Sequence, residues 1–275
     1  MSRYGQGGEV TGPSRRSAVR GALLVAGGTL LAGAVDLGTA RGVLAAAQPT
    51  IHTRGAWNAR APRSAVDVFN RRPDHIVVHH TATANSTNYT QSQAFALSRS
   101  IQNYHMDTQG WKDIGQQLTI SRGGHIVEGR SQSLPTMRNR TFNLGTHVSG
   151  HNDHTVGIEN EGTYTSATPP TALFNSLAAT CAWLCAQWSL DPATAIVGHR
   201  DYNATACPGD RLYAMLPQLR REAANRLARL EARLDTLGYS EIPQDHWPTY
   251  PEVPEAERAA EFHHGPALGP GDAAG

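Results

Sequence analysis

The stretch of residues 74–79 constrains the fold of this 275-residue chain more than any other. Its apolar side chains are contiguous over residues 76–78, without the alternation that a strand with one wet face would show. We therefore expect a strand buried on both faces, inside a sheet that other elements cover on each side. Two histidines, His79 and His80, follow at its end.

Other segments alternate between strand and helix patterns, with one interruption. Residues 111–130 predict a hairpin that turns at Gly123 and Gly124. Because this hairpin interrupts the alternation, we expect an α/β fold with a mixed central β-sheet flanked by helices on both faces. The long polar segment 131–153 is expected to be a binding loop across the site. Apolar spacing predicts helices at 92–106, 173–188 and 212 to about 235, and strands at 155–160 and 195–197.

The apolar run 195–197 also leads to a histidine, His199, and Cys207 follows after seven intervening loop residues. Imidazole and thiolate are ligands that zinc accepts readily. His79 lies at the end of the other apolar run, so His79, His199 and Cys207 form a candidate set of three ligands. Three protein ligands with one open position are typical of a catalytic zinc site. The alternative is a hydrogen-bonded histidine beside a buried thiol.

Composition excludes some classes of function. The chain has a net charge of +1 and 17% charged residues, which gives no reason to propose a nucleic acid partner. Thirteen histidines against three cysteines indicate imidazole chemistry rather than a disulfide framework. Cys181 and Cys185 share the apolar stripe of a predicted helix. Buried free thiols are expected there, because a disulfide between them fits a helix poorly.

The N-terminal segment predicts an export signal. Arg15 and Arg16 form a twin-arginine pattern, a weakly apolar segment follows at 21–35, and small residues at 45–47 offer a cleavage site. We expect residues 1–47 to engage the twin-arginine export machinery, which makes the protein secreted or part of the cell envelope. The apolar run is too short and glycine-rich to favour a stable membrane span. The alternatives are an uncleaved anchor or a chance arginine pair.

Six motifs then follow one another between residues 54 and 221, at 76–83, 110–115, 120–130, 145–147, 156–159 and 198–209. In this order they resemble the zinc-dependent N-acetylmuramoyl-L-alanine amidases related to phage lysozyme amidases and peptidoglycan recognition proteins. On this resemblance residues 48–221 form an amidase domain and 222–238 a C-terminal helix extension. Residues 239–275 are rich in Pro, Gly, Ala and acidic side chains, which predicts a disordered tail.

The resemblance implies a mainly parallel mixed sheet and a groove for a glycan with its stem peptide. It implies one zinc ion per chain, held by His79, His199 and Cys207. The implied reaction is hydrolysis of the amide between N-acetylmuramic acid and L-alanine, with peptidoglycan or a muropeptide as the substrate. We expect the protein to be a monomer.

Further roles come from the resemblance. Glu159 is the candidate general base, although Glu161 competes because it lies on the same strand face by period two, and a surface or salt-bridged glutamate is the alternative. Thr205 is a candidate for steadying the oxyanion, or it caps the loop. Gln116 stands where many relatives carry a tyrosine that assists the hydrolytic water. Gln116 has no titrating proton, so either Glu159 alone carries proton transfer or activity is weak.

Three residues are candidates for substrate binding: His147 in the groove loop, His80 and Trp111. For His147 the alternative is a solvent-exposed loop histidine. For the whole chain the alternative is a non-catalytic peptidoglycan-binding protein on the same fold, but the presence of Cys207 favours the enzyme. A third possibility is a zinc amidohydrolase that acts on a different acyl-peptide.

Overall fold

The structure is a computed structural model that describes residue 45 and residues 47–235. The predicted tail at 239–275 and almost all of the predicted signal peptide at 1–47 lie outside this range, as does the end of the predicted helix extension. Within the described residues, no helix has the length and the apolar character that a bilayer span needs.

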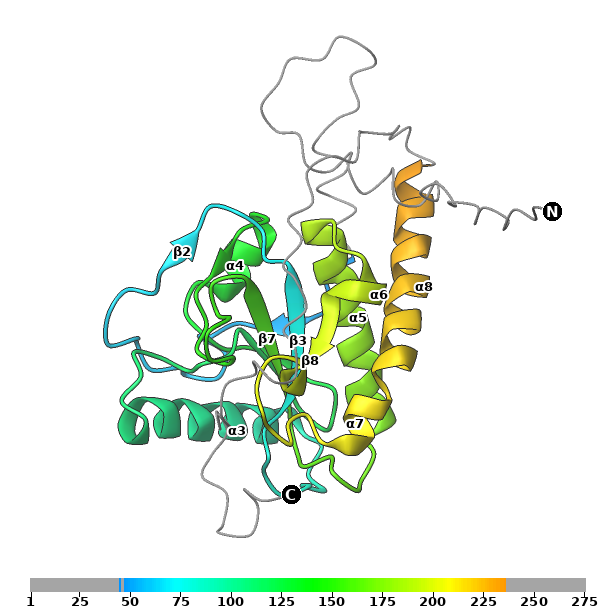
Figure 1. Cartoon of the computed structure of the whole chain (residues 1–275). Helices are drawn as coiled ribbons and strands as arrows, with labels where there is room; N and C mark the ends of the chain where they lie inside the picture. The colour runs from blue at the N-terminus through cyan, green and yellow to red at the C-terminus, as the bar shows by residue number, and fades with distance from the viewer. Residues whose placement is uncertain (1–44, 46, 236–275) are drawn as a thin grey trace, which may run out of the picture.

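A mixed six-stranded sheet lies at the centre of the molecule (Figure 1), in the order β1-β5-β4-β7-β3-β8. The β4–β5 pair is antiparallel and the other pairs are parallel, which confirms both the predicted hairpin and the mixed sheet. A separate antiparallel pair joins β2 to β6. The strands are β1 (Ile51–His52), β2 (Val68–Phe69), β3 (His75–His80), β4 (Leu118–Ile120), β5 (Ile126–Glu128), β6 (Phe142–Asn143), β7 (Thr155–Asn160) and β8 (Ile196–Gly198).

Helices cover both faces of the sheet, as predicted. Helices α5 (Thr171–Trp188) and α8 (Leu216–Asp235) lie on one side and α3 (Gln91–Asn103) on the other (Figure 1). Ile76 and Val78 of β3 join the core beneath α5 and α8, whereas Val77 packs on the opposite face. All three are fully buried, so β3 is buried on both faces, as its apolar run predicted.

The predicted helix at 212–235 is in fact two helices, α7 (Asp210–Ala214) and α8, which meet at Met215. Pro217 explains the break, because it has no N–H to donate to the carbonyl of Tyr213 and its ring would clash there. The apolar stripe of α8 belongs to the same core as the sheet. The boundary expected at residue 221 therefore falls inside a helix that packs against α5 beyond that point.

Several short elements lie where the sequence predicted only loop. The segment 131–153 contains α4 (Ser133–Arg138) and β6. The start of α4 is held from outside, because Leu134 N–H donates to Glu128 Oε1 over 2.9 Å. Helix α6 (Pro192–Ala195), capped by Asp191, and the single 3₁₀ turn η2 (His199–Asp201) flank β8. Elements this short do not show a recognisable period.

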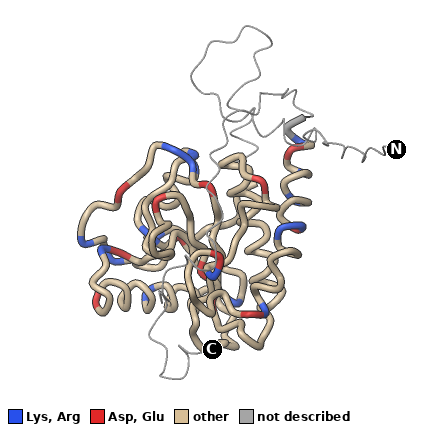
Figure 2. The backbone as a smooth tube through the Cα atoms, in the orientation of Figure 1, with Lys and Arg blue, Asp and Glu red and all other residues tan. Residues whose placement is uncertain are grey.

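Helix α3 ends three residues earlier than predicted. It gives way at Asn103 to a wider π-helical turn, η1 (Tyr104–Thr108), in which Gln109 N–H donates to Tyr104 O. Cys181 and Cys185 are free thiols buried on α5. Charges of both signs are spread over the described fold rather than gathered in one basic patch (Figure 2).

Candidate metal site

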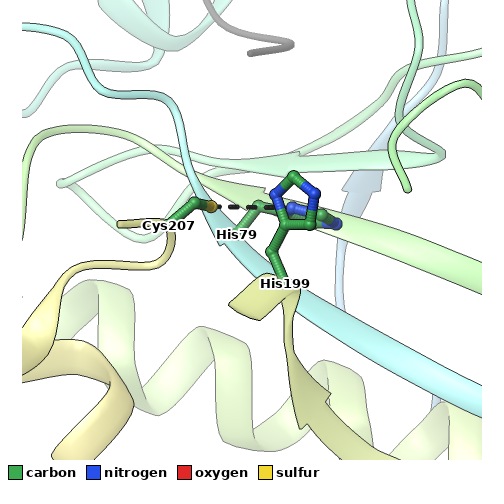
Figure 3. Close-up of side chains that lie close together, drawn as sticks. All are labelled: His79, His199 and Cys207. Carbon is green, nitrogen blue, oxygen red and sulfur yellow. Dashed lines mark hydrogen bonds between the residues drawn. The ribbon is translucent and has the colours of Figure 1, made fainter. Parts of the chain in front are cut away.

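Three side chains, one from β3 and two from the segment that follows β8, converge at the carboxyl ends of these strands (Figure 3). His79 lies on β3, His199 begins η2 directly after β8, and Cys207 lies in the loop before α7. Because β3 and β8 are parallel neighbours, their ends meet at one edge of the sheet. Ligand atoms of the three residues all lie within 4.8 Å of one another.

The orientation of both imidazoles is defined by contacts on the far side of each ring. His79 Nδ1 lies 3.7 Å from Cys207 Sγ, while His79 Nε2 lies 3.1 Å from His147 Nδ1. His199 Nε2 lies 3.0 Å from Asn203 Oδ1. On these contacts, Nδ1 is the candidate ligand atom of each histidine.

The Cys207 side chain is buried. Burial raises its pKa to about 12, although the His80 N–H, 3.4 Å from Sγ, and Arg200 both act to lower it. At neutral pH the thiol of the metal-free protein is therefore protonated, and a bound cation would stabilise the thiolate. Two imidazoles and one thiolate, all buried, form a donor set that fits zinc with one coordination position open.

Glu159 lies in the same row of side chains as His79. It is the register partner of His79 across the β3–β7 pair and of Thr119 across the β4–β7 pair. Register partners on parallel strands project to the same face of a sheet, so the carboxylate shares a face with the candidate ligand. The Glu159 side chain is fully buried.

Glu161 has different surroundings, although only one residue separates it from Glu159. Its Oε1 accepts from Gln93 Nε2 over 3.1 Å, and its Oε2 accepts from Arg122 N–H over 2.7 Å. Glu161 thus ties α3 and the β4–β5 turn to the end of β7.

Gln116 is buried close to this row. Its Nε2 donates to Thr119 Oγ1 over 2.9 Å, and its Oε1 has no hydrogen-bond partner among the described residues. Gln116 is therefore hydrogen-bonded to Thr119, the register partner of Glu159 on β4. Thr205 lies in the loop between η2 and α7, where its Oγ1 accepts from Cys207 N–H over 3.2 Å. Its side chain is partly exposed.

The three residues predicted to bind substrate lie in three different settings. His147 is fully buried behind His79. Its ring packs on Gly157, and a Cβ at position 157 would lie only 2.6 Å from that ring. His80 lies on the opposite face of β3 from His79, and its Nδ1 accepts from Tyr164 N–H over 3.2 Å. Trp111 is partly exposed and stacks on His105 with ring centroids 4.5 Å apart.

Sequence reasoning missed Asn203. The side chain is fully buried, and it contacts both His199 and the backbone of Ser149. An asparagine four residues after a histidine carries no recognisable signal in a loop. Only the turn of η2 places its amide against the imidazole.

Solved structures of known proteins share this fold. The solved structure of wild-type Drosophila PGRP-LB matches 61% of this chain and 92% of its own, with a TM-score of 0.53 and 29% identity. Drosophila peptidoglycan recognition protein SD matches 62% of this chain and 95% of its own, with a TM-score of 0.54 and 27% identity. The fold is thus that of the peptidoglycan recognition proteins.

The family described as N-acetylmuramoyl-L-alanine amidase matches residues 69–210, which is just over half of the chain. This chain belongs to that family. N-acetylmuramoyl-L-alanine amidase of Homo sapiens is 32% identical over 169 residues, and peptidoglycan-recognition protein LB of Drosophila melanogaster is 30% identical over 162 residues. These alignments cover 61% and 59% of this chain, but only 28% and 65% of the two relatives.

Proposed function

We propose that this protein is a zinc-dependent amidase that hydrolyses the bond between N-acetylmuramic acid and L-alanine in peptidoglycan. The observation that carries the proposal is the buried group of His79, His199 and Cys207, whose ligand atoms lie within 4.8 Å of one another. Membership of the amidase family supports it. A binding protein needs no such group, whereas a hydrolytic metal site does.

The three residues would hold zinc as two neutral imidazoles and one thiolate, leaving about one unit of positive charge. Zinc bound there would supply a Lewis acid that polarises the scissile carbonyl and acidifies the attacking water. His79 would hold the ion from the same face of the sheet that carries Glu159, its register partner on β7.

Glu159 is the proposed proton carrier. Its carboxylate accepts a proton as the water oxygen bonds to the carbonyl carbon, and it returns that proton to nitrogen as the carbon–nitrogen bond breaks. The products are the free lactyl carboxylate and the free amine of L-alanine. Gln116 has no proton to exchange, so its proposed role is a hydrogen bond that steadies the reacting groups. Thr205, whose hydroxyl lies beside Cys207, is the candidate for steadying the oxyanion.

The proposed substrate and location rest on the family and on the predicted export signal. A variant of Drosophila PGRP-LB has been solved in complex with tracheal cytotoxin, and this structure is 29% identical to our chain. We propose that a muropeptide of this kind, or the intact wall, is the substrate here. The twin-arginine pattern around Arg15 and Arg16 supports export to the cell envelope or medium.

A muropeptide digest tests the proposal. Purified, zinc-loaded protein should release stem peptides with a new L-alanine N-terminus, and chelator should stop the release; mass spectrometry of the digest identifies both products. Binding to muropeptide without cleavage would instead indicate a recognition protein. Cleavage at another amide would indicate a different amidohydrolase.

Zinc content tests the ligand assignment separately. His79→Ala, His199→Ala and Cys207→Ala should each lose most of the bound metal, because each removes one of three ligands. Elemental analysis of the purified variants measures this directly. A Cys207→Ala protein that keeps one zinc per chain would contradict the assignment.

A further inference from the structure

The two proposed zinc histidines are both contacted, on the side away from Cys207, through one short segment. We call residues 147–152, between β6 and β7, the backing loop. We propose that His147 and Asn203 are positioning residues that fix the orientation and tautomer of His79 and His199, and that the backing loop holds both. This inference rests on the zinc site of the proposed function, but not on the reaction.

On the His79 side the contact is direct. His79 Nε2 and His147 Nδ1 lie 3.1 Å apart, and both rings are fully buried. One of the two nitrogens must donate and the other accept. If His79 Nε2 donates, His79 Nδ1 keeps the lone pair that a metal needs, and this is the nitrogen 3.7 Å from Cys207 Sγ. His147 then carries its own proton on Nε2.

On the His199 side the contact passes through Asn203. Asn203 Oδ1 lies 3.0 Å from His199 Nε2, and an amide oxygen can only accept, so His199 carries its proton on Nε2. The amide orientation is set by the backing loop. Ser149 N–H donates to Asn203 Oδ1 over 3.2 Å, and Asn203 Nδ2 donates to Ser149 O over 3.3 Å. Rotating the amide by half a turn would break both bonds and face a donor towards the imidazole.

Asn152 braces the backing loop itself. Its Oδ1 accepts from His147 N–H over 2.7 Å and from Val148 N–H over 3.0 Å, and its Nδ2 donates to Val148 O over 2.6 Å. Val148 is buried against Val77 and Tyr202. The segment that holds His147 behind His79 therefore also holds Asn203 against His199. The backing loop thus contacts one ring through His147 and the other through Asn203.

Groups that hold the far nitrogen of a metal-binding histidine raise metal affinity by fixing the ring and its tautomer. A purely structural role predicts something else: loss of folding stability with unchanged zinc affinity in the folded protein. The two roles are separable, because zinc affinity and the stability of the metal-free chain can be measured independently.

The test compares Asn203→Leu, which removes the acceptor at similar volume, with Asn203→Asp, which keeps an oxygen for His199 Nε2. The matched control is Asn143→Leu, because Asn143 on β6 is also fully buried but its Nδ2 donates to Ser131 O. Zinc affinity is measured by competition with a chromophoric chelator, and the stability of the metal-free proteins by thermal unfolding.

Asn203→Leu should bind zinc about 10–100-fold more weakly, while Asn203→Asp recovers most of the affinity. Asn143→Leu should keep wild-type zinc affinity even where it unfolds at a lower temperature. An Asn203→Leu protein within about threefold of wild-type affinity overturns the inference, and so does an equal loss in the Asn143→Leu control.

Imidazole nitrogen NMR of the zinc-loaded protein reads the tautomers directly and covers the case in which a variant folds poorly. Wild-type His79 and His199 should each show a metal-bound Nδ1 and a protonated Nε2. His147→Leu should disturb the His79 signals more than His147→Gln, which keeps an acceptor. Zinc bound through Nε2 of either ring overturns the inference. Normal zinc and tautomers without amidase activity would contradict the proposed function alone.

Discussion

Glu159 and Glu161 show how little separation is needed to give two carboxylates different roles. Both are buried, but Glu161 is bound by Gln93 and by the backbone of Arg122, whereas Glu159 lies in register with His79. A carboxylate held by two donors from neighbouring elements is suited to joining those elements. A carboxylate on the face of the metal ligands is suited to moving a proton.

We expect Glu159→Gln to keep its fold and its zinc but to lose about a hundredfold or more in turnover, because the amide cannot carry the proton. Steady-state kinetics on a muropeptide, together with zinc analysis, measures this. Glu161→Gln is the control and should mainly lower thermal stability. If Glu161→Gln loses turnover while Glu159→Gln retains it, Glu161 is the base.

Gln116 should matter less than Glu159. Gln116→Ala removes its hydrogen bond to Thr119 Oγ1 but no titrating group, so we expect a smaller loss of turnover than for Glu159→Gln. Gln116→Tyr restores the side chain of many relatives and is expected to match or exceed wild-type turnover. Kinetics of the three variants under one condition rank them. A Gln116→Ala loss as large as that of Glu159→Gln would contradict this order.

We expect Asp74, the residue directly before β3, to make the stability of the protein depend on pH. Burial raises the pKa of its carboxyl to about 6, against the lowering effect of Arg71 and Arg72. Since the folded state binds this proton more tightly than the unfolded state, the contribution of Asp74 is most favourable below about pH 4. That contribution is lost as the pH rises to about 6, by at most about 3 kcal/mol.

Asp74→Asn should therefore gain stability relative to wild type between about pH 4 and 6, with a constant difference above that range. Denaturant unfolding of both proteins across this range measures it. Burial also lowers the pKa of His154 to about 4, and His154 Nδ1 lies 3.9 Å from Asp74 Oδ2. His154 contributes to stability with the opposite pH dependence, because its contribution is lost as the pH falls. Both proteins keep His154, so the difference in stability between them reports mainly on Asp74. A difference that does not change with pH would contradict the prediction.

At the scale of the element, α8 is part of the core rather than an appendage. Leu219, Ala223, Leu227 and Leu230 are buried in the cluster that contains α5 and the sheet. Figure 1 shows α8 running alongside α5. A chain that ends at residue 240 keeps the whole helix, whereas one that ends at residue 221 removes three of these four side chains from the core.

Leu227→Ala should lower the free energy of unfolding by about 2–5 kcal/mol, because it leaves a cavity between α8 and the core. Arg229→Ala, at an exposed position of the same helix, is the control and should change it by less than about 0.5 kcal/mol. Denaturant unfolding measures both. Equal effects of the two substitutions would mean that α8 is not packed as described.

At the scale of the whole molecule, the proposed export would bring the folded domain to its proposed substrate outside the cytoplasm. The twin-arginine route carries folded proteins, so the zinc site could be complete before transport. Replacing Arg15 and Arg16 by Lys should stop export, because the receptor recognises the paired guanidinium groups. Cell fractionation compares this double variant with Arg20→Lys, which leaves the pair intact. Normal secretion of the double variant would indicate another route.

The sequence alone determined the elements whose signal is local. The unbroken apolar run before His79 predicted β3, alternating strand and helix patterns predicted the layers, and the hairpin predicted the antiparallel pair. The three candidate metal ligands were also readable, because each lies at a strand end or in the loop that follows. Pro217 was visible too, and its missing N–H would have predicted the break at Met215.

Only the tertiary structure decided which groups surround those ligands. The sequence did not indicate the contact between His147 and His79, and Asn203 carried no signal at all. The short strands β1 and β2 were likewise invisible, since partner strands distant in sequence hold them in place. The spacing of apolar residues along the sequence indicates which face of a helix or strand is buried. It does not report which side chains from other elements meet it there, because those contacts exist only once the chain has folded.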